Sequence, residues 1–199
     1  MGEDKAFLRL GGETLLSRAL NLAKSLTPRV RIVGEAAKFA GLGAVVEDVY
    51  PNRGPLGGIH AALVNTKTAV NLMLAVDTPF IESSFLEFLI SEARSSGAVV
   101  TVPRSDGHMH PLCAVYRKEF AASAEQSLIL GQNRIDALFS GVKTRVVEEA
   151  ELQRLGFRPE MFRNLNTPEK WQEANLDLAK KTSCENLKQF REQSNERTN

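Results

Sequence analysis

An aspartate at the end of an apolar run is the side chain of this sequence best placed for chemistry. The run 71–76 has the composition of a buried strand, and Asp77-Thr78-Pro79-Phe80 follows it directly. Ligands of open α/β sheets gather at the carboxyl ends of strands, and a carboxylate suits a hard cation such as Mg²⁺. Asp77 is therefore placed to hold such a cation, although the segment alone leaves open that it caps the next helix or forms an Asx-turn.

Two further charged residues lie where a ligand could reach them. Lys5 precedes the apolar segment 6–8 and could contact phosphates, but most lysines are solvated surface charges. Asp48 ends Val45-Val46-Glu47-Asp48, which repeats the pattern of a strand followed by an acid. A turn or a helix cap is the simpler interpretation of Asp48 taken singly.

A glycine-rich stretch lies between Asp48 and Asp77 in the sequence. The segment Asn52-Arg53-Gly54-Pro55-Leu56-Gly57-Gly58 leads into a helical pattern over 59–64. We predict a loop that meets the N-terminus of a helix, where exposed backbone N–H groups suit an anion.

The histidines allow a metal site but favour a structural role. His108 and His110 form a His-x-His pair, with His60 as a third potential ligand. The neighbouring segment 104–107 is typical of a hairpin turn, and no fixed spacing links the pair to a carboxylate. Cys113 lies in an apolar run and is expected to be a buried small hydrophobe.

Alternating helical and strand patterns must position these residues. A stripe of apolar residues at helical spacing predicts a helix over Leu15–Leu26, and Ser84 with Glu87 predicts a capping box that opens another. Strands, several of them covered on both faces, are expected at Val30–Val33, Ala44–Val46, Val70–Val76, Ala98–Val102, Leu112–Tyr116 and Thr144–Val147. This order predicts an α/β fold with a mainly parallel sheet.

Composition narrows the function classes. The 199 residues are 43% hydrophobic and 25% charged, with a formal net charge of +1, so no overall field attracts nucleic acid or an anionic membrane. The two cysteines form no CxxC motif. No apolar run approaches the roughly 20 residues of a membrane span, and no signal peptide is evident. We expect a cytoplasmic protein that binds neither nucleic acid nor membrane.

Five short motifs in chain order resemble those of the molybdenum cofactor guanylyltransferases, which are nucleotidyltransferases with a Rossmann-like three-layer α/β fold. The motifs are Met1-Gly2-Glu3-Asp4-Lys5-Ala6, Gly54-Pro55-Leu56-Gly57-Gly58, Ala75-Val76-Asp77-Thr78-Pro79-Phe80, His110-Pro111-Leu112 and Asn164-Leu165-Asn166-Thr167-Pro168. The resemblance predicts a nucleotidyltransferase domain over 1–175. The remainder, 176–199, is expected to be a polar tail in which a helix ends near Lys181 and disorder follows.

The resemblance implies transfer of GMP from GTP to molybdenum-molybdopterin, with release of pyrophosphate. It makes Lys5 and Asp77 catalytic, Asp77 as the Mg²⁺ ligand. Contacts to nucleotide or pterin cofactor are implied for Lys5, Asp48, Gly54, Pro55, Leu56, Gly57 and Asn166. Molybdoenzymes or other cofactor-biosynthesis proteins are the implied protein contacts.

The sequence departs from the family pattern at its start. The family has a strand and a glycine-rich loop ahead of the Met-Gly-x-Asp-Lys motif with which this sequence opens. Loss of that strand would expose hydrogen-bonding groups and apolar surface at the centre of the sheet. We therefore expect the chain as written to be poorly active or unstable.

Alternatives of two classes stay open. A molybdopterin cytidylyltransferase or a sugar-phosphate nucleotidyltransferase would share the lysine, aspartate and glycine features. A truncated, non-catalytic nucleotide-binding module would fit the missing loop, but such a module need not keep Lys5, Asp77 and Asn166 together.

Overall fold

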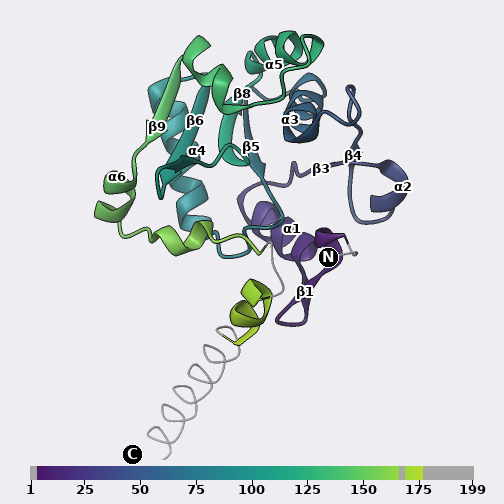
Figure 1. Cartoon of the computed structure of the whole chain (residues 1–199), viewed down its shortest axis with the longest axis vertical. Coiled ribbons are helices and arrows are strands. Elements are labelled where there is room, and N and C mark those ends of the chain that lie inside the picture. The colour runs from purple at the N-terminus through teal and green to yellow at the C-terminus, as the bar shows by residue number, and fades with distance from the viewer. Residues whose placement is uncertain (1–3, 166–168, 177–199) are drawn as a thin grey trace, which may run out of the picture.

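The computed structural model describes residues 4–165 and 169–176, in which a five-stranded sheet lies between helices (Figure 1). Strand β8 (Cys113–Arg117) pairs with β5 (Val70–Leu74) on one side and with β6 (Val100–Ser105) on the other. Strand β6 also pairs with β9 (Thr144–Val147) and with the short β7 (His108–Met109). The predicted α/β architecture is confirmed.

The pairing gives the sheet two reversed strands, β7 and β8, so the described sheet is mixed and not mainly parallel as predicted. Strand β8 is antiparallel to both β5 and β6, whereas β6 and β9 are parallel, so β5, β6 and β9 share one direction. The apolar runs in the sequence located β5, β6, β8 and β9 to within a few residues, because each run supplies side chains to both covered faces.

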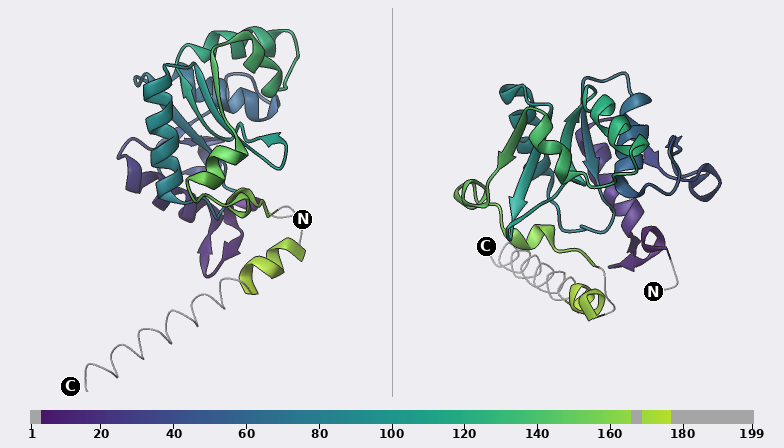
Figure 2. Two further views of the ribbon diagram at one scale, coloured as in Figure 1. Left: turned by 90° about the vertical axis from the view of Figure 1, so that its left-hand side faces the viewer. Right: turned by 45° about the horizontal axis from the view of Figure 1, so that its top comes forward.

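Helices cover the two faces of the sheet and make three layers (Figure 2). Helices α3 (Gly54–Val64) and α5 (Phe120–Ile129) pack on one face, whereas α4 (Ser83–Ser96) packs on the other. The last described strand is followed by α6 (Glu149–Arg154) and the 3-10 turn η3 (Pro159–Phe162). The turn η2 (Asp136–Gly141) precedes β9.

The N-terminal part forms smaller units beside this sheet. The turn η1 (Lys5–Phe7) leads into a hairpin of β1 (Arg9–Leu10) and β2 (Glu13–Thr14), which the sequence analysis did not predict. Helix α1 (Leu15–Leu26) follows, and β3 (Ile32–Val33) pairs in parallel with β4 (Val45–Val46) around the short α2 (Ala36–Phe39). Strands β3 and β4 form a sheet of their own.

Because β3 and β4 form a separate sheet, β5 is an edge strand of the five-stranded sheet. Among the described residues its strand partner is β8, and all five residues from Val70 to Leu74 are half-buried. Val70, Leu72 and Leu74 pack against the core cluster on the α4 side and Met73 against the cluster on the α3 side, so the prediction that this run is covered on both faces is confirmed for β5. Its apolar composition suits a central strand, but nothing described pairs with its outer edge.

Two predicted helix starts are also wrong. Helix α4 begins at Ser83 with Glu82 as N-cap and without a side-chain capping bond, so Ser84 lies inside the helix and forms no capping box. Helix α3 begins at Gly54, so the glycine-rich stretch predicted as a loop is the start of the helix itself. Pro55 suits a first helical turn because the N–H it lacks would have no helical partner there.

The C-terminal prediction is tested only in part. Residues 169–176 are helical, as predicted for the segment after Thr167-Pro168. The predicted helix end near Lys181 and the predicted disorder beyond it lie outside the described residues. In the described part of the chain, no helix has the length and apolar character needed to cross a membrane.

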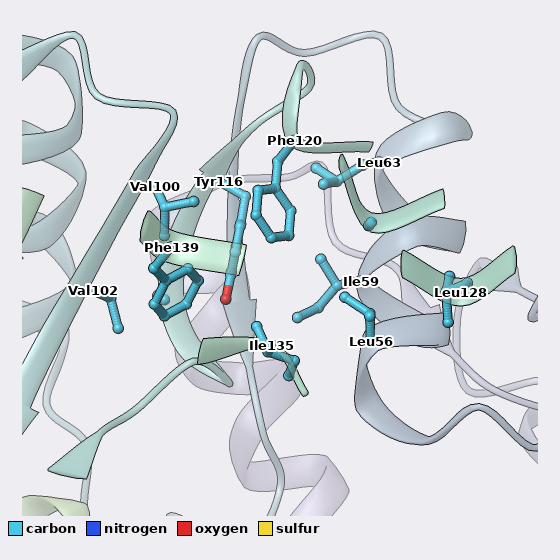
Figure 3. Packing of buried hydrophobic residues seen from close by; sticks show 12 residues of the cluster. Leu56, Ile59, Leu63, Val100, Val102, Tyr116, Phe120, Leu128, Ile135 and Phe139 are labelled. Carbon is cyan, nitrogen blue, oxygen red and sulfur yellow. The ribbon is translucent and has the colours of Figure 1, made fainter. Parts of the chain in front are cut away.

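Tyr116 is the largest fully buried side chain of the main core. Its ring lies 5.0 Å from that of Phe120 and 6.5 Å from that of Phe139, among the apolar side chains of α3 (Figure 3). Its hydroxyl donates to the carbonyl oxygen of Pro111 at 2.8 Å. The neighbouring Cys113 is buried as predicted, and burial raises the pKa of its thiol to about 12, which keeps it protonated and unreactive.

Tyr116→Phe tests how strongly this hydroxyl holds the segment before β8. Removal of the hydroxyl leaves the Pro111 carbonyl without its partner, so we expect the free energy of unfolding to fall by about 1–3 kcal/mol in urea denaturation. Tyr50→Phe is the matched control, because the Tyr50 hydroxyl bonds Glu125 at the surface. Equal losses in both variants would contradict a special role for the Tyr116 bond.

Candidate active site

Asp77 lies in the loop that leaves the carboxyl end of β5. The loop is held on two sides: Ala75 N–H donates to the Leu112 carbonyl at 2.8 Å, and Leu165 N–H donates to the Asp77 carbonyl at 3.1 Å. The Asp77 side chain is 26% exposed, so its carboxylate can meet a ligand. The capping alternative is wrong, because the next helix begins at Ser83 with Glu82 as its cap.

Lys5 reaches the same place from the other end of the sequence. Its Nζ atom lies 3.9 Å from Oδ2 of Asp77. The turn that carries it is capped by Asp4, whose carboxylate accepts the Ala6 N–H at 2.9 Å and also pairs with Lys38. Ala6 is buried in a cluster that Val76 also contacts. The structure therefore brings together the two residues that the sequence analysis named as catalytic.

The C-terminal segment closes the site from a third direction. Leu165 is fully buried in a cluster with Leu10 and Leu15, against which Val76 and Phe80 pack. The Arg163 guanidinium lies 4.7 Å from the centre of the Phe80 ring. Asn166 itself lies outside the described residues, but the bond from Leu165 to Asp77 places the preceding residue at the predicted site.

Asp48 is packed against helix α3. A Cβ atom added to Gly58 would lie 3.7 Å from Asp48 Oδ1, and one added to Gly57 would lie 3.1 Å from the Tyr50 carbonyl oxygen. Desolvation by this packing raises the pKa of the Asp48 carboxyl. The glycines thus serve a close approach between α3 and the segment 48–50, a reason that the sequence alone did not reveal.

The start of α3 offers backbone donors to a ligand. Its N-cap, Arg53, makes no side-chain capping bond, and Gly54 and Pro55 are exposed. The first N–H groups of a helix carry partial positive charge and bind anions. Leu56 is fully buried, backbone included, so the structure as it stands does not expose this predicted contact residue to a ligand.

The histidines do not form a metal centre. His60 is 2% exposed on α3, with Nε2 3.9 Å from a Glu125 oxygen, whereas His108 is exposed on the β6–β7 hairpin. Among residues 4–165 and 169–176, no group of three or more His, Cys, Asp or Glu side chains could hold a metal ion. The predicted hairpin turn is confirmed: Asp106 and Gly107 have φ values of 50° and 74°, as a type I′ turn requires.

Two cavities flank the β6–β7 hairpin, and the sequence analysis missed both. One, of about 520 Å³, is lined by Pro55 at the start of α3 and by Arg104 and Pro111. The other, of about 630 Å³, is lined by Ser105, His110, Phe162 and Asn164. No local motif marks such cavities, because their walls come from segments far apart in the sequence.

Comparisons with known proteins agree on one family. The MobA-like NTP transferase domain matches residues 1–148. A protein of Pelotomaculum thermopropionicum named probable molybdenum cofactor guanylyltransferase is 35% identical over 171 residues, which cover 84% of this chain and 82% of the relative. A molybdenum cofactor guanylyltransferase of Desulfosudis oleivorans is 31% identical over 175 residues, covering 87% and 86%.

A solved structure supports the fold. The molybdopterin-guanine dinucleotide biosynthesis protein A of Archaeoglobus fulgidus matches with a TM-score of 0.80 at 24% identity, over 90% of this chain and 92% of that chain. The predicted Rossmann-like three-layer nucleotidyltransferase fold is thereby confirmed.

Gly57→Ala tests the close approach of α3 to the segment 48–50. An alanine normally favours a helix interior by roughly 1 kcal/mol over glycine. Here the new methyl group would press on the Tyr50 carbonyl oxygen, so we expect a lower melting temperature than wild type. Gly141→Ala is the control, because nothing lies within 4 Å of its added Cβ. A Gly57→Ala protein as stable as wild type would show that the helix can move away freely.

Proposed function

The chain belongs to the MobA-like NTP transferase family, and from this premise we propose that it transfers GMP from GTP to molybdenum-molybdopterin. The Lys5–Asp77 pair at the carboxyl end of β5 is the observation that carries the proposal. The names of the two relatives support the guanylyl group and a molybdenum cofactor as its acceptor. The same assignment implies contacts with proteins that supply or receive the cofactor.

The reaction is a displacement at phosphorus. An oxygen of the acceptor's terminal phosphate forms a bond to the α-phosphorus of GTP, the bond from that phosphorus to the bridging oxygen breaks, and pyrophosphate leaves. Catalysis of this kind consists mainly of positioning and of neutralising negative charge. Both tasks can be met by side chains and backbone groups on rigid elements.

The residues around Asp77 suit these tasks. Lys5 brings a positive charge to the phosphates, and its neighbour Asp77 limits the positions that its ammonium group takes up. The N–H groups at the start of α3 supply further donors for a phosphate. Asp48, an exposed carboxylate beside the same helix, would bind the nucleoside part.

The donor set fits a magnesium ion that arrives with the nucleotide. Mg²⁺ commonly binds through one or two carboxylates together with substrate phosphates and water. Asp77 is a partly exposed carboxylate of this kind, and the amide oxygen of Asn166 would be a second ligand. When bound, the ion supplies positive charge to the phosphates.

A nucleotide panel tests the proposed reaction. With a molybdopterin acceptor and Mg²⁺, we expect pyrophosphate release from GTP to exceed release from CTP, ATP or UTP by at least tenfold. A preference for CTP would reject the guanylyl assignment in favour of a cytidylyltransferase. Nucleotide binding without any pyrophosphate release would favour a non-catalytic binding module.

Asp77→Asn tests the metal ligand. The amide keeps the shape of the side chain but loses its charge, so we expect Mg²⁺-dependent turnover to fall by about 100-fold or more. The affinity for Mn²⁺ in the presence of GTP, measured by electron paramagnetic resonance, should fall in parallel. Glu87→Gln removes an exposed carboxylate on α4 and is the charge-matched control. Unchanged turnover and Mn²⁺ affinity in Asp77→Asn would remove the metal role.

A further inference from the structure

The chain between β4 and α3 carries Asp48 but has few anchors in the core. Within the segment 47–55 no residue is buried, and Tyr50 and Arg53 are half-buried. Desolvation alone raises the pKa of the Asp48 carboxyl, and in the described part of the chain no side-chain hydrogen bond or ion pair holds this group. The position of the carboxylate therefore depends on how the backbone around it is held.

Tyr50 is the side chain that joins this segment to the main core. Its ring packs against the core cluster, and its hydroxyl donates to Oε1 of Glu125 at 3.2 Å. Partial desolvation, followed by the hydrogen bond to Glu125 and the charge of Glu125, raises the pKa of the Tyr50 hydroxyl. The hydroxyl therefore stays protonated and remains a donor. Tyr50 thus connects the segment that carries Asp48 to helix α5.

His60 adjoins both partners of this hydrogen bond. Its ring centre lies 5.2 Å from that of Tyr50 with the planes at 64°, and its Nε2 atom lies 3.9 Å from the same Glu125 oxygen. The side chain is 2% exposed, and neither ring nitrogen has a hydrogen-bond partner. Buried polar atoms without partners reduce stability. An apolar side chain of similar size would therefore be more stable here if His60 only filled space.

Glu125 is the residue at which three segments meet. It belongs to α5, which lies beside α3 (Figure 1), and one of its carboxylate oxygens faces both Tyr50 and His60. Its side chain is 50% exposed, so it is not needed to fill the core. Exposed polar contacts of this kind add little to stability. Their effect here is on the position of the segment 48–50.

We propose that Glu125 and Tyr50 are positioning residues for nucleotide binding. Their hydrogen bond holds the segment 48–50 against α3 and so sets where the Asp48 carboxylate meets the nucleoside. His60 limits the positions that both side chains take up. The inference rests on the proposed function for the role of Asp48. It adds that α5, which has no expected contact with substrate, controls the affinity of the site for nucleotide.

Calorimetric titration with GTP and Mg²⁺, without an acceptor, tests the proposal. Tyr50→Phe loses the hydroxyl, and we expect the dissociation constant for GTP to rise about fivefold. Glu125→Ala should give a similar rise, whereas Glu125→Gln keeps an acceptor for the hydroxyl and should recover most of the affinity. Melting temperatures should stay near that of wild type, because the hydrogen bond lies at the surface.

Two controls separate positioning from charge and from general disturbance of the site. Glu119→Ala is the matched variant, because Glu119 is an exposed carboxylate at the start of α5 without a side-chain capping bond. Loss of a negative charge alone should strengthen the binding of an anion, which is opposite to the change expected for Glu125→Ala. Inorganic tripolyphosphate lacks the nucleoside, so its affinity should stay within about twofold of wild type in every variant.

A double-mutant cycle with Asp48→Asn tests whether Tyr50 acts through the carboxylate. We expect Asp48→Asn to weaken GTP binding, and Tyr50→Phe to add almost nothing to that loss in the Asp48→Asn background. Such coupling is the signature of two residues that act as one unit. An equal loss from Tyr50→Phe in both backgrounds overturns the inference.

The remaining outcomes separate this inference from the proposed function. Wild-type affinity for GTP in Tyr50→Phe, Glu125→Ala or Asp48→Asn overturns the inference, as does an equal loss of affinity for tripolyphosphate. A Glu125→Gln protein as weak as Glu125→Ala overturns it as well. None of these results decides whether the wild type transfers GMP. Selective, Asp48-dependent loss of GTP affinity in a protein that transfers no GMP would support the positioning role and reject only the proposed reaction.

Discussion

Strand β8 is the element on which the geometry of both the core and the candidate site depends. It pairs with β5 along the strand that leads to Asp77, and the segment that enters it carries His110. A register shift of one residue would turn Tyr116 away from the core and move both neighbours of the site. The hydrogen bond from the Tyr116 hydroxyl to the Pro111 carbonyl holds the segment that precedes this strand against the core.

The charged pair at the site does not hold itself in place. Lys5 and Asp77 are 41% and 26% exposed at a separation of 3.9 Å, and such pairs contribute little to stability. Apolar contacts set their positions: Ala6 anchors the lysine, and Val76 with Leu165 anchors the aspartate. The attraction between the two charges therefore contributes little to the position of either side chain.

The sequence predicted the structure correctly where a local pattern of residues has only one physical interpretation. Strands β5, β6, β8 and β9 of the main sheet were predicted from β-branched or apolar runs, and Lys5 and Asp77, both predicted to be catalytic, lie close together in the structure. It failed where distant packing decides, as at Gly57, whose need for a small residue comes from the Tyr50 carbonyl. The stack of His110 on Phe162 joins segments about fifty residues apart, so no short pattern could mark it.

The edge position of β5 in the described sheet has one more consequence. Among the described residues no strand pairs with its outer edge, so that edge offers backbone donors and acceptors along five residues, to which a strand from another molecule can pair. Pairing there would cover the segment that leads directly into Asp77. An edge strand that leads into the candidate site thus links any strand pairing at β5 directly to the position of Asp77.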